Sequence, residues 1–566
     1  MTNIVARHYS PETAAKLVAE GVPTVLARIY AARGIGSAAQ LQSSLTGLIL
    51  PDQLKNSNRM AQLLADAIEQ NKRILIVADY DSDGATACAV GVKALQGFGA
   101  TVDYLVPNRF EHGYGLTPDI VRLALPRQPD IIMTVDNGIA SVEGVAEANR
   151  LGIAVLVTDH HLPGDTLPDA ACIVNPNAPG CTFSSKNLAG VGVIFYVMLA
   201  LRAELRNRGR FADRAEPNLT ELLDLVALGT VADVVRLDDN NRILVEQGLR
   251  RIRAGKASHG VLALLGVAGR DPVRASTYDL GFVLGPRLNA AGRLEDMGLG
   301  IACLLAGDED TANQLAARLD EINRNRREIE SGMQESALSA LDAVAAENGY
   351  SLCLYNADWH QGVIGILASR LKDKFHRPTI IFAAAGDGTI KGSGRSIAGL
   401  HLRDALDLVS KRQPGLILKF GGHAMAAGLA IDEAAFPEFV EQFEQVASEL
   451  LTPGDLEQVI ETDGSLAAAE HNLPTAQAVD NGIWGQGFAA PTFEGRFLVA
   501  GQRVVGERHL KLKLEKGGQQ FDAMLFFQTE LLPATIQAVY QIGVNEFRGS
   551  HTVQLTLRHW YAAPAF

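Results

Sequence analysis

Five short apolar runs between residues 72 and 174, rich in β-branched side chains, constrain the fold of this chain more than any other feature. The runs cover residues 72–78, 102–106, 131–135, 153–157 and 172–174. Helix-like segments alternate with them. Continuous apolar strands that alternate with helices are typical of βαβ units, in which helices cover both faces of a parallel sheet. The sequence therefore predicts an α/β domain built on a parallel sheet.

The length of the chain and its changes of pattern predict several domains. At about 150 residues per domain, 566 residues are enough for three or four. After Pro453, short segments that alternate apolar with polar residues are separated by glycines, which predicts a small barrel such as an OB-fold. The expected parts are an N-terminal helical segment (1–45), the α/β domain (46–270), a helical connector (271–347), a second α/β domain (348–452) and an all-β domain (453–566).

Residues 308–347 have the pattern of one long helix. They contain few turn formers, and apolar or small residues recur at steps of three, four or seven. This spacing predicts an amphipathic helix, which at 1.5 Å per residue is long enough to link two domains. Two ordinary helices with a break near residues 323–326 are the alternative.

The composition excludes several classes of protein. Hydrophobic residues make up 47% and charged residues 20%, as in ordinary globular proteins. No apolar run reaches the ~18 residues of a membrane span, and the first residues lack the apolar core of a secretory signal. Five widely spaced cysteines indicate free thiols, so we expect a cytoplasmic protein. The net charge of −13 argues against a nonspecific nucleic-acid coat, but is compatible with a nucleic-acid enzyme that has local basic grooves.

A cluster of acidic residues follows the first apolar run. Asp79, Asp81 and Asp83 alternate with other residues and precede a glycine. Three carboxylates within five residues repel one another unless a cation neutralises them. A calcium-binding EF-hand loop begins in the same way, but its twelfth position must carry a glutamate, and that position is Val90 here. Another divalent cation is therefore favoured.

Two later runs end in the same kind of chemistry. Asp136 follows residues 131–135, and Asp159-His160-His161 follows the next run. Because ligands in open α/β sheets bind beyond the carboxyl ends of the strands, these side chains should meet in one cleft. Asp233, in an otherwise apolar helix-like stretch, is either a helix cap or a further ligand of this site. Mixed carboxylate and imidazole ligands suit Mn²⁺ and Mg²⁺.

These motifs carry a resemblance to a known family. Residues 79–84, 136–138, 159–161 and 229–233 resemble, in order and spacing, the four motifs of the DHH phosphoesterase superfamily. Residues 107–116, 285–293, 393–396 and 421–428 are similar to motifs of its members that degrade single-stranded DNA. The resemblance extends from about residue 45 to the end of the chain.

The resemblance implies a fold, an activity and a metal site. The fold is a parallel-sheet DHH domain joined by a long helix to a smaller α/β DHH-associated domain, plus a C-terminal all-β OB-fold. The implied enzyme is a single-stranded-DNA-specific 5′→3′ exonuclease that uses two Mn²⁺ or Mg²⁺ ions and releases 5′-mononucleotides in DNA repair and recombination. Asp136 would bridge the ions and act in catalysis, His161 would face the scissile phosphate, and Asp159 would orient an imidazole. The implied metal ligands are Asp79, Asp81, Asp83, Asp136, His160 and Asp233.

The resemblance also implies substrate contacts. Ser393, Arg395, Arg109 and Arg287 would surround the terminal 5′ phosphate, and His423 would approach the nucleotide. Aromatic residues in or beside the motifs could stack on bases or belong to the core; they are Tyr80, Tyr114 and Trp359. The basic segment 503–516 fits an OB-fold face that follows a phosphate backbone, or else a solvated hairpin.

The expected partners are single-stranded DNA, a single-stranded-DNA-binding protein and a RecQ-like or RecBCD-independent helicase, and we expect a monomer without membrane contact. Two alternatives remain. Smaller DHH proteins cleave oligoribonucleotides, cyclic dinucleotides, pyrophosphate or phosphoadenosine phosphate, and they usually lack the terminal β domain. A non-catalytic scaffold that holds DNA or replication proteins would typically have lost acidic ligands that are present here.

Overall fold

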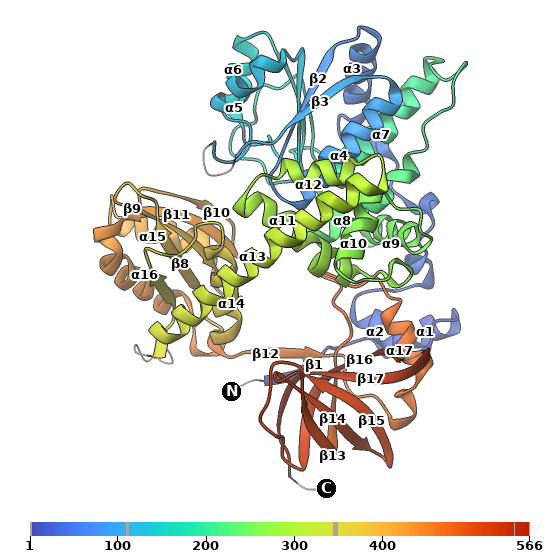
Figure 1. Ribbon diagram of the computed structural model, residues 1–566, viewed down its shortest axis with the longest axis vertical. Coiled ribbons are helices and arrows are strands. Elements are labelled where there is room, and N and C mark those ends of the chain that lie inside the picture. Colours follow the sequence, from blue (N-terminus) through green and yellow to red (C-terminus); the bar gives the residue numbers. More distant parts are fainter. Residues whose placement is uncertain (1–2, 109–111, 343–348, 548, 565–566) are drawn as a thin grey trace. The chain divides into compact units, whose positions relative to one another are not determined.

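The computed structural model describes residues 3–108, 112–342, 349–547 and 549–564, which fall into two compact units (Figure 1). One unit consists of Met1–Val5 and Glu321–Ile460, and the other of Ala6–Asp320 and Glu461–Phe566. No helix among the described residues is both long and apolar enough to cross a membrane.

The larger unit contains the predicted parallel sheet. Its strands are β2 (Arg73–Ala78), β3 (Thr101–Leu105), β4 (Ile131–Val135), β5 (Ala154–Thr158) and β6 (Cys172–Val174). They lie in the order β3-β2-β4-β5-β6, and every neighbouring pair is parallel. β3 lies on one side of β2, and the next strand in the sequence, β4, lies on the other side. The direction in which strands are added to the sheet therefore reverses between β2 and β4. This switch point is where a crevice opens at the carboxyl ends of the strands.

Helices cover both faces of this sheet (Figure 1). Leu75 and Val77 of β2 pack with α5 (Pro118–Ala124) and α6 (Val142–Arg150). Ile74 and Ile76, which point to the other face, join the cluster formed by α3 (Ser57–Glu69), α4 (Ser82–Phe98) and α7 (Gly190–Asn207). Both faces are therefore buried, which explains why the strands are apolar throughout.

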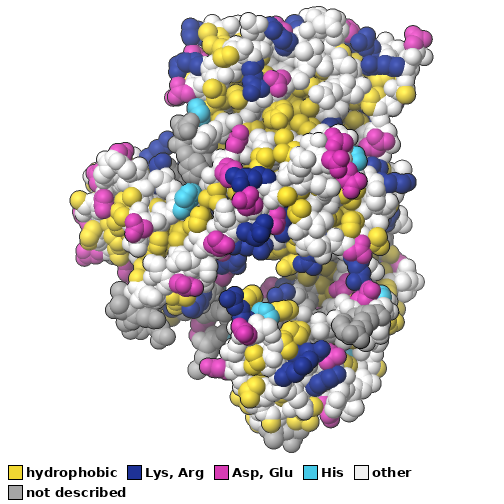
Figure 2. Space-filling model, in the orientation of Figure 1, with side chains coloured by type: hydrophobic (Ala, Val, Ile, Leu, Met, Phe, Trp, Pro, Cys, Tyr) yellow, Lys and Arg dark blue, Asp and Glu magenta, His cyan; other side chains and the backbone are white. Residues whose placement is uncertain are grey.

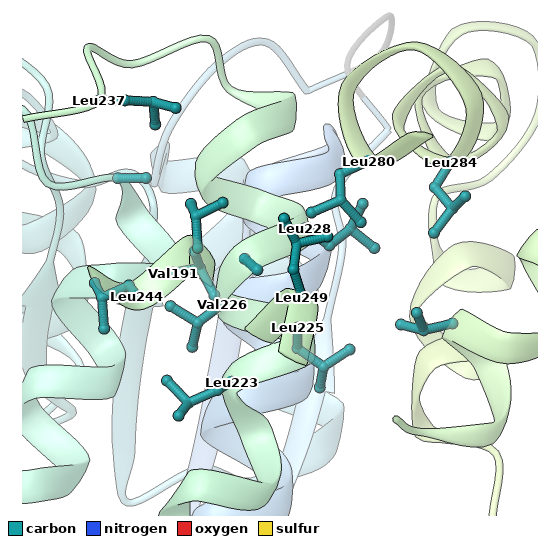
Figure 3. Packing of buried hydrophobic residues seen from close by; sticks show 14 of the residues in the cluster. Val191, Leu223, Leu225, Val226, Leu228, Leu237, Leu244, Leu249, Leu280 and Leu284 are labelled. Carbon is teal, nitrogen blue, oxygen red and sulfur yellow. The ribbon is translucent and has the colours of Figure 1, made fainter. Parts of the chain in front are cut away.

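Further helices extend the core beyond the sheet. They are α8 (Leu223–Ala232), α9 (Asp239–Arg253), α10 (His259–Val267), the π-helical turn η7 (Asp279–Leu284), α11 (Gly285–Leu294) and α12 (Gly298–Leu305). Figure 3 shows leucines of α8 packed among side chains of its neighbours, including Val191, Leu244 and Leu280. Because neighbours surround α8, most of its side chains are apolar, whichever way they point. Asp233 is the C-cap residue of this helix.

The N-terminal region is helical only in part. As expected, α1 (Pro11–Ala19) and α2 (Thr24–Ala32) are helices. Residues Asn3–Ala6, however, form a strand, β1, which pairs with β12 (Val459–Thr462). The predicted N-terminal helical segment is thus helical in α1 and α2 and extended at Asn3–Ala6, whose partner strand lies more than 450 residues away in the sequence.

One continuous helix, α13, covers Glu309–Asp342 and belongs to both units. The alternative of a break near residues 323–326 is wrong. Arg326 donates to the Asn323 side chain and pairs with Glu330, four residues later, at 2.8 Å. The break region is thus held by bonds along one helix face. Residues 343–348, at the expected end of the helix, lie outside the described residues.

The smaller unit contains a mixed sheet. Its strands are β7 (Leu352–Tyr355), β8 (Thr379–Ala384), β9 (Thr389–Arg395), β10 (Lys419–Gly422) and β11 (Ala426–Asp432), in the order β10-β11-β9-β8-β7. Only β7 and β8 pair in parallel. The helices are α14 (Ile364–Phe375), α15 (Leu402–Arg412) and α16 (Phe436–Leu450). Stacked aromatic rings, including Phe439 and Phe443, form the centre of its core.

The C-terminal strands form a closed barrel, as predicted. They are β13 (Phe493–Val505), β14 (His509–Lys516), β15 (Gln519–Leu525), β16 (Thr535–Phe547) and β17 (Ser550–Ala562), preceded by the short helix α17 (Leu473–Asp480). The order is β13-β14-β15-β17-β16, and only β15 and β17 pair in parallel. Trp484 and Phe488, just before the barrel, stack against Tyr30 of α2. The barrel thus shares a core with the N-terminal helices.

Candidate metal centre

Acidic residues gather at the switch point of the parallel sheet. Asp79, Asp81 and Asp83 follow β2, and Asp136 follows β4, the neighbouring strand. His160 follows β5, the next strand along. The sequence prediction that successive strands deliver these side chains to one place agrees with this arrangement, because parallel strands end at the same edge.

The ligand-type atoms lie close enough to share metal ions. His160 Nε2 lies 3.2 Å from Asp136 Oδ1, 3.5 Å from Asp233 Oδ2 and 3.9 Å from Asp83 Oδ2. Three groups have ligand atoms within 4.8 Å of one another: Asp136, His160 and His161; Asp83, His160 and Asp233; and Asp79, Asp81 and Asp136. Asp136 and His160 each occur in two of them.

The site fits a divalent cation on its own chemistry. Asp136 Oδ1 and His160 Nε2 are buried and have no hydrogen-bond partner among the described residues. Burial, reinforced by the neighbouring carboxylates, raises the pKa of Asp136 and Asp233 well above the usual range and that of Asp83 to about 7. Burial also lowers the pKa of His160 to about 4, which keeps its imidazole neutral and able to ligate. A bound cation would reduce the repulsion between the carboxylates and give Asp136 Oδ1 and His160 Nε2 a partner.

Backbone groups fix Asp83 in the site. The N–H groups of Gly190 and Val191, at the start of α7, donate to its two carboxylate oxygens at 2.6 and 2.9 Å. Asp81, the N-cap of α4, accepts from the N–H groups of Asp83 and Gly84. Helix N-termini favour negative charge, so both carboxylates are held at places that stabilise them.

Three glycines allow the helices to approach these carboxylates. A Cβ at Gly190 would lie 2.4 Å from Asp136 Oδ1, and one at Gly229 would lie 2.9 Å from Asp83 Oδ1. At Gly84 the added atom would lie 2.5 Å from the Asp79 carbonyl oxygen. Sequence reasoning singled out Gly84 and Gly229 within motifs, but it missed Gly190, whose role depends on a contact with a residue 54 positions earlier.

The imidazole that Asp159 contacts is that of His161; the prediction named Asp159 as a residue that orients an imidazole, without saying which one. Asp159 is buried, and its Oδ1 lies 2.8 Å from His161 Nδ1. Burial opposes protonation of His161, yet the bond to Asp159 and the charges of the acidic cluster raise its pKa to about 9. The Tyr114 hydroxyl lies 3.2 Å from His161 Nε2. Tyr114, which was predicted to contact the substrate, therefore lies next to the candidate metal centre.

A small cavity of about 180 Å³ adjoins the metal centre. It is lined by Tyr80, Asp81, Ala232, Asp233, Asn289 and Arg293. Asn289 Oδ1 accepts from the Ser82 N–H and hydroxyl, which ties α11 to the start of α4. Sequence reasoning missed Asn289 and Arg293, although their spacing of four residues in motif 285–293 places them on one helix face.

Arg287, the residue chosen from that motif, is placed differently. It is buried, pairs with Asp320 at 2.8 Å and donates to the Val283 carbonyl oxygen. This pairing stabilises the connection between α11 and α13. It disfavours the predicted contact of Arg287 with a terminal phosphate, because its guanidinium is already engaged by the half-buried Asp320 carboxylate and the Val283 carbonyl oxygen.

The remaining predicted substrate residues lie in the smaller unit, apart from Arg109, which is outside the described residues. Ser393 and Arg395 lie on β9, with Arg395 Nη1 3.2 Å from Ser393 Oγ. A Cβ at Gly365, in the first turn of α14, would lie 2.9 Å from Ser393 Oγ and 3.0 Å from Arg395 Nη2. His423 is exposed in the turn between β10 and β11. Trp359 is buried, which favours the core role for it.

Comparisons with known proteins agree with this architecture. Family models match in chain order: the DHH family N-terminal domain at residues 73–230, the DHHA1 domain at 348–449 and the RecJ OB domain at 462–559. The fold and the carboxylate–histidine centre thus define a metal-dependent phosphoesterase of the DHH type.

Relatives narrow this class. The single-stranded-DNA-specific exonuclease RecJ of Dickeya dadantii is 52% identical and that of Escherichia coli is 51% identical, each aligned over 98% of this chain and over 99% and 98% of the relative. The crystal structure of RecJ from Thermus thermophilus in complex with Mn²⁺ matches with a TM-score of 0.83 at 29% identity, covering 100% of this chain and 80% of that one. The same protein with Mg²⁺ matches with a TM-score of 0.77 at 28% identity, covering 100% and 79%. The chain belongs to the RecJ family of exonucleases.

These findings confirm the predicted family, the fold class and the metal-dependent nuclease class. They also confirm Mn²⁺ or Mg²⁺ as the metal, since both ions occur in RecJ structures and the clusters of this chain could hold them. The domain limits and the roles of single residues remain predictions.

Proposed function

We propose that the protein degrades single-stranded DNA from its 5′ end and releases 5′-mononucleotides by hydrolysis at the metal centre. One observation carries the proposal: the buried atoms Asp136 Oδ1 and His160 Nε2 lie 3.2 Å apart without a hydrogen-bond partner among the described residues, in a chain 52% identical to a single-stranded-DNA-specific exonuclease. The full set of carboxylates disfavours a non-catalytic scaffold.

The residues that would hold two ions are Asp79, Asp81, Asp83, Asp136, His160 and Asp233. Asp136 and His160 each belong to two of the three ligand groups, and Asp136 is the candidate bridge because a carboxylate has two oxygens that can bind two ions, whereas His160 offers one free ring nitrogen. When bound, the ions would supply a water of lowered pKa and neutralise charge that develops on the phosphate. Five carboxylates and one imidazole, all hard or borderline donors, suit such ions.

His161 would act on the phosphate as a cation. Asp159 engages Nδ1 and raises the pKa of His161, which favours the protonated ring. The Tyr114 hydroxyl lies against the ring, 3.3 Å from Nδ1 and 3.2 Å from Nε2. An imidazolium there can donate to a phosphate oxygen or to the leaving 3′ oxygen. Tyr114 would hold the ring and contact the terminal nucleotide.

A terminal phosphate pocket would explain the requirement for a 5′ end. Arg395 and Ser393 lie against the first turn of α14, whose N-terminus has no side-chain cap. A guanidinium, a hydroxyl and a helix N-terminus together suit a phosphate group. His423 and Arg109 stay in the proposal as further contacts, and Arg293 with Asn289 replaces Arg287 as the contact next to the metal centre.

The pocket predicts a difference between two kinds of strand end. Arg395→Ala should weaken degradation of 5′-phosphorylated strands about tenfold or more, and that of 5′-hydroxyl strands much less, because one charge-assisted phosphate contact is lost. Steady-state kinetics on both strands measures this, with Arg403→Ala on α15 as a surface control. Equal losses on the two substrates would count against the pocket.

The proposed function is tested with end-labelled DNA and Mn²⁺. The wild-type protein should release mononucleotides stepwise from the 5′ end of a single strand and leave the matching blunt duplex intact. Asp136→Ala should abolish this activity, while Asp165→Ala, which removes an exposed acid of the same domain, should retain it. Rapid cleavage of a dinucleotide with the long strand untouched would assign the protein to the small-substrate branch of DHH enzymes instead.

We also propose protein partners and a cellular location, because the proposed substrate is single-stranded DNA. A helicase of the RecQ-like or RecBCD-independent type would generate the single strand, and a single-stranded-DNA-binding protein would cover it before digestion. We place the protein in the cytoplasm because DNA is its substrate, and we propose a monomer. For the domains we propose the limits 1–45, 46–270, 271–347, 348–452 and 453–566, which are compatible with the residues matched by the family models.

A further inference from the structure

Two large aromatic side chains are exposed on the helical segment that leads to the metal centre. Tyr278 is 55% exposed and Phe282 is 68% exposed. Their rings stack on each other with centroids 5.3 Å apart and planes 24° apart. A stacked aromatic pair left in solvent is a surface on which a further planar ring can stack. Neither residue entered the sequence predictions.

The backbone directs this pair outward. Leu280, Val283 and Leu284 of η7 are buried, so Phe282 faces away from the core. Gly281 and Gly285 lie against α8: a Cβ at either would lie 3.2 Å from Val231 or Ala232, respectively. The segment is therefore anchored at the end of α8, directly before the candidate ligand Asp233. A π-helical turn is rare and frequently occurs at functional sites.

A cation lies beside the pair. The Arg270 guanidinium carbon is 6.0 Å from the centre of the Tyr278 ring, and its Nε is 3.4 Å from Asp279 Oδ1. The other oxygen of Asp279 accepts from the N–H and hydroxyl of Ser276. Asp279 thus holds Arg270 and the start of the helix together. Aromatic rings next to a cation are the combination that binds bases and phosphates of a single strand.

The pair lies along the chain between two cavities of the same unit. Asn289 and Arg293 line the cavity next to the metal centre, and Phe282 precedes Asn289 by seven residues, about two helical turns or ~10 Å. Upstream, a cavity of about 740 Å³ separates residues 273–277 from the barrel. Among its lining residues are Arg274, Ser276, Gln541 and His551. A single DNA strand that runs from the metal centre toward the barrel along this helical segment would contact the aromatic pair.

We infer that Tyr278 and Phe282 form a stacking platform for bases of the single-stranded substrate, about three nucleotides from the reacting end. The inference rests on the proposed function. The distance follows from ~10 Å of helix and about 3.4 Å per stacked base. The occupant is the DNA strand because the surface continues the substrate site along one helical segment and because a stacked ring pair beside a guanidinium offers faces on which bases stack. Stacking tolerates any base, as a nuclease that digests every sequence requires.

The test compares long and short strands. Binding of a 5′-phosphorylated 12-mer and of a dinucleotide is measured by fluorescence anisotropy in Ca²⁺, and turnover of both in Mn²⁺. The Tyr278→Ala/Phe282→Ala variant should bind the 12-mer about tenfold more weakly and the dinucleotide equally well. Phe282→Trp should retain wild-type affinity. Leu50→Ala, which removes a 61% exposed apolar side chain outside the proposed DNA surfaces, is the control.

Abasic nucleotides separate stacking from a structural role. With abasic sites at positions three to five, the wild type should lose the same tenfold and the double variant should lose nothing further. Equal losses on the 12-mer and the dinucleotide, or a persistent difference between the proteins on the abasic strand, would overturn the platform. Unchanged affinity of the double variant, with a wild type active on single strands, would also overturn it. A wild type without single-strand activity would instead refute the proposed function.

Discussion

At the scale of the residue, burial and charge assign the two histidines different tasks. His160 is nearly enclosed, and burial lowers its pKa to about 4, so it stays a neutral ligand. His161, one position later, has its pKa raised to about 9 by the Asp159 bond and the acidic cluster, against the effect of burial. The same residue type therefore has its pKa shifted in opposite directions within one dipeptide, and only the surroundings distinguish the two rings.

The raised pKa of His161 predicts a pH dependence of stability in EDTA, where no bound cation adds its own charge. Between about pH 6.5 and about 9 the folded state binds more protons than the unfolded state. The stabilisation is therefore fully present below about pH 6.5 and is lost as the pH rises through about 9. We expect Tm to fall by about 1–3 °C over this range because of His161. Scanning calorimetry of the wild type and His161→Gln measures it. Equal slopes for both proteins would contradict the assignment.

At the scale of the element, close helix approach builds the metal centre. The N-terminus of α7 binds Asp83 through two N–H groups, and Gly190 leaves room for Asp136 beside it. Helix α8 reaches the same place through Gly229. Side chains at these positions would push the helices outward by more than the site tolerates, since metal ligands must be placed within a few tenths of an ångström.

Gly190→Ala is therefore expected to reduce Mn²⁺-dependent activity by more than about tenfold, because its Cβ would overlap Asp136 Oδ1. Isothermal titration with Mn²⁺ and exonuclease assays measure the effect. Gly266→Ala is the matched control: it lies in helix α10 with no atom within 4 Å of the added Cβ, and should keep activity and gain slightly in stability. Full activity of Gly190→Ala would show that α7 can move without cost.

At the scale of the whole molecule, the barrel of the larger unit is both a structural part and a candidate DNA surface. Trp484 and Phe488 stack with Tyr30, and Arg242 lies 4.4 Å from the Phe488 ring centre. Removing all residues after Pro453 would expose this core, so the effect of such a truncation on long strands could not be separated from instability. Point changes on the outer barrel face are the cleaner test.

Figure 2 shows Lys and Arg side chains over β14 and β15. Arg503 and Lys511 are paired across β13 and β14 and have no ion-pair partner among the described residues, whereas Lys513 pairs with Asp522 at 2.9 Å. Replacing Arg503 and Lys511 by Ala should raise KM on long strands several-fold, leave dinucleotide turnover unchanged and reduce the salt slope by about two. Lys513→Ala should have less effect. Equal salt slopes for all proteins would favour the solvated-hairpin interpretation.

The sequence by itself determined the elements and the identity of the metal-ligand motifs. The apolar runs ending in Asp79, Asp136 and Asp159 predicted the parallel sheet and the place of the site, because strand period and strand end are local properties. The long helix and the barrel were predictable for the same reason. Family motifs then identified the chemistry.

Only the tertiary structure decided which side chains reach the site. It placed Arg293 rather than Arg287 beside Asp233, bound Asp83 to the start of α7, paired β1 with β12 and left Tyr278 and Phe282 in solvent. Each of these results depends on residues that are distant in the sequence or on the rotation of a helix about its axis. Local patterns carry no information on such contacts, because packing of the whole chain selects them.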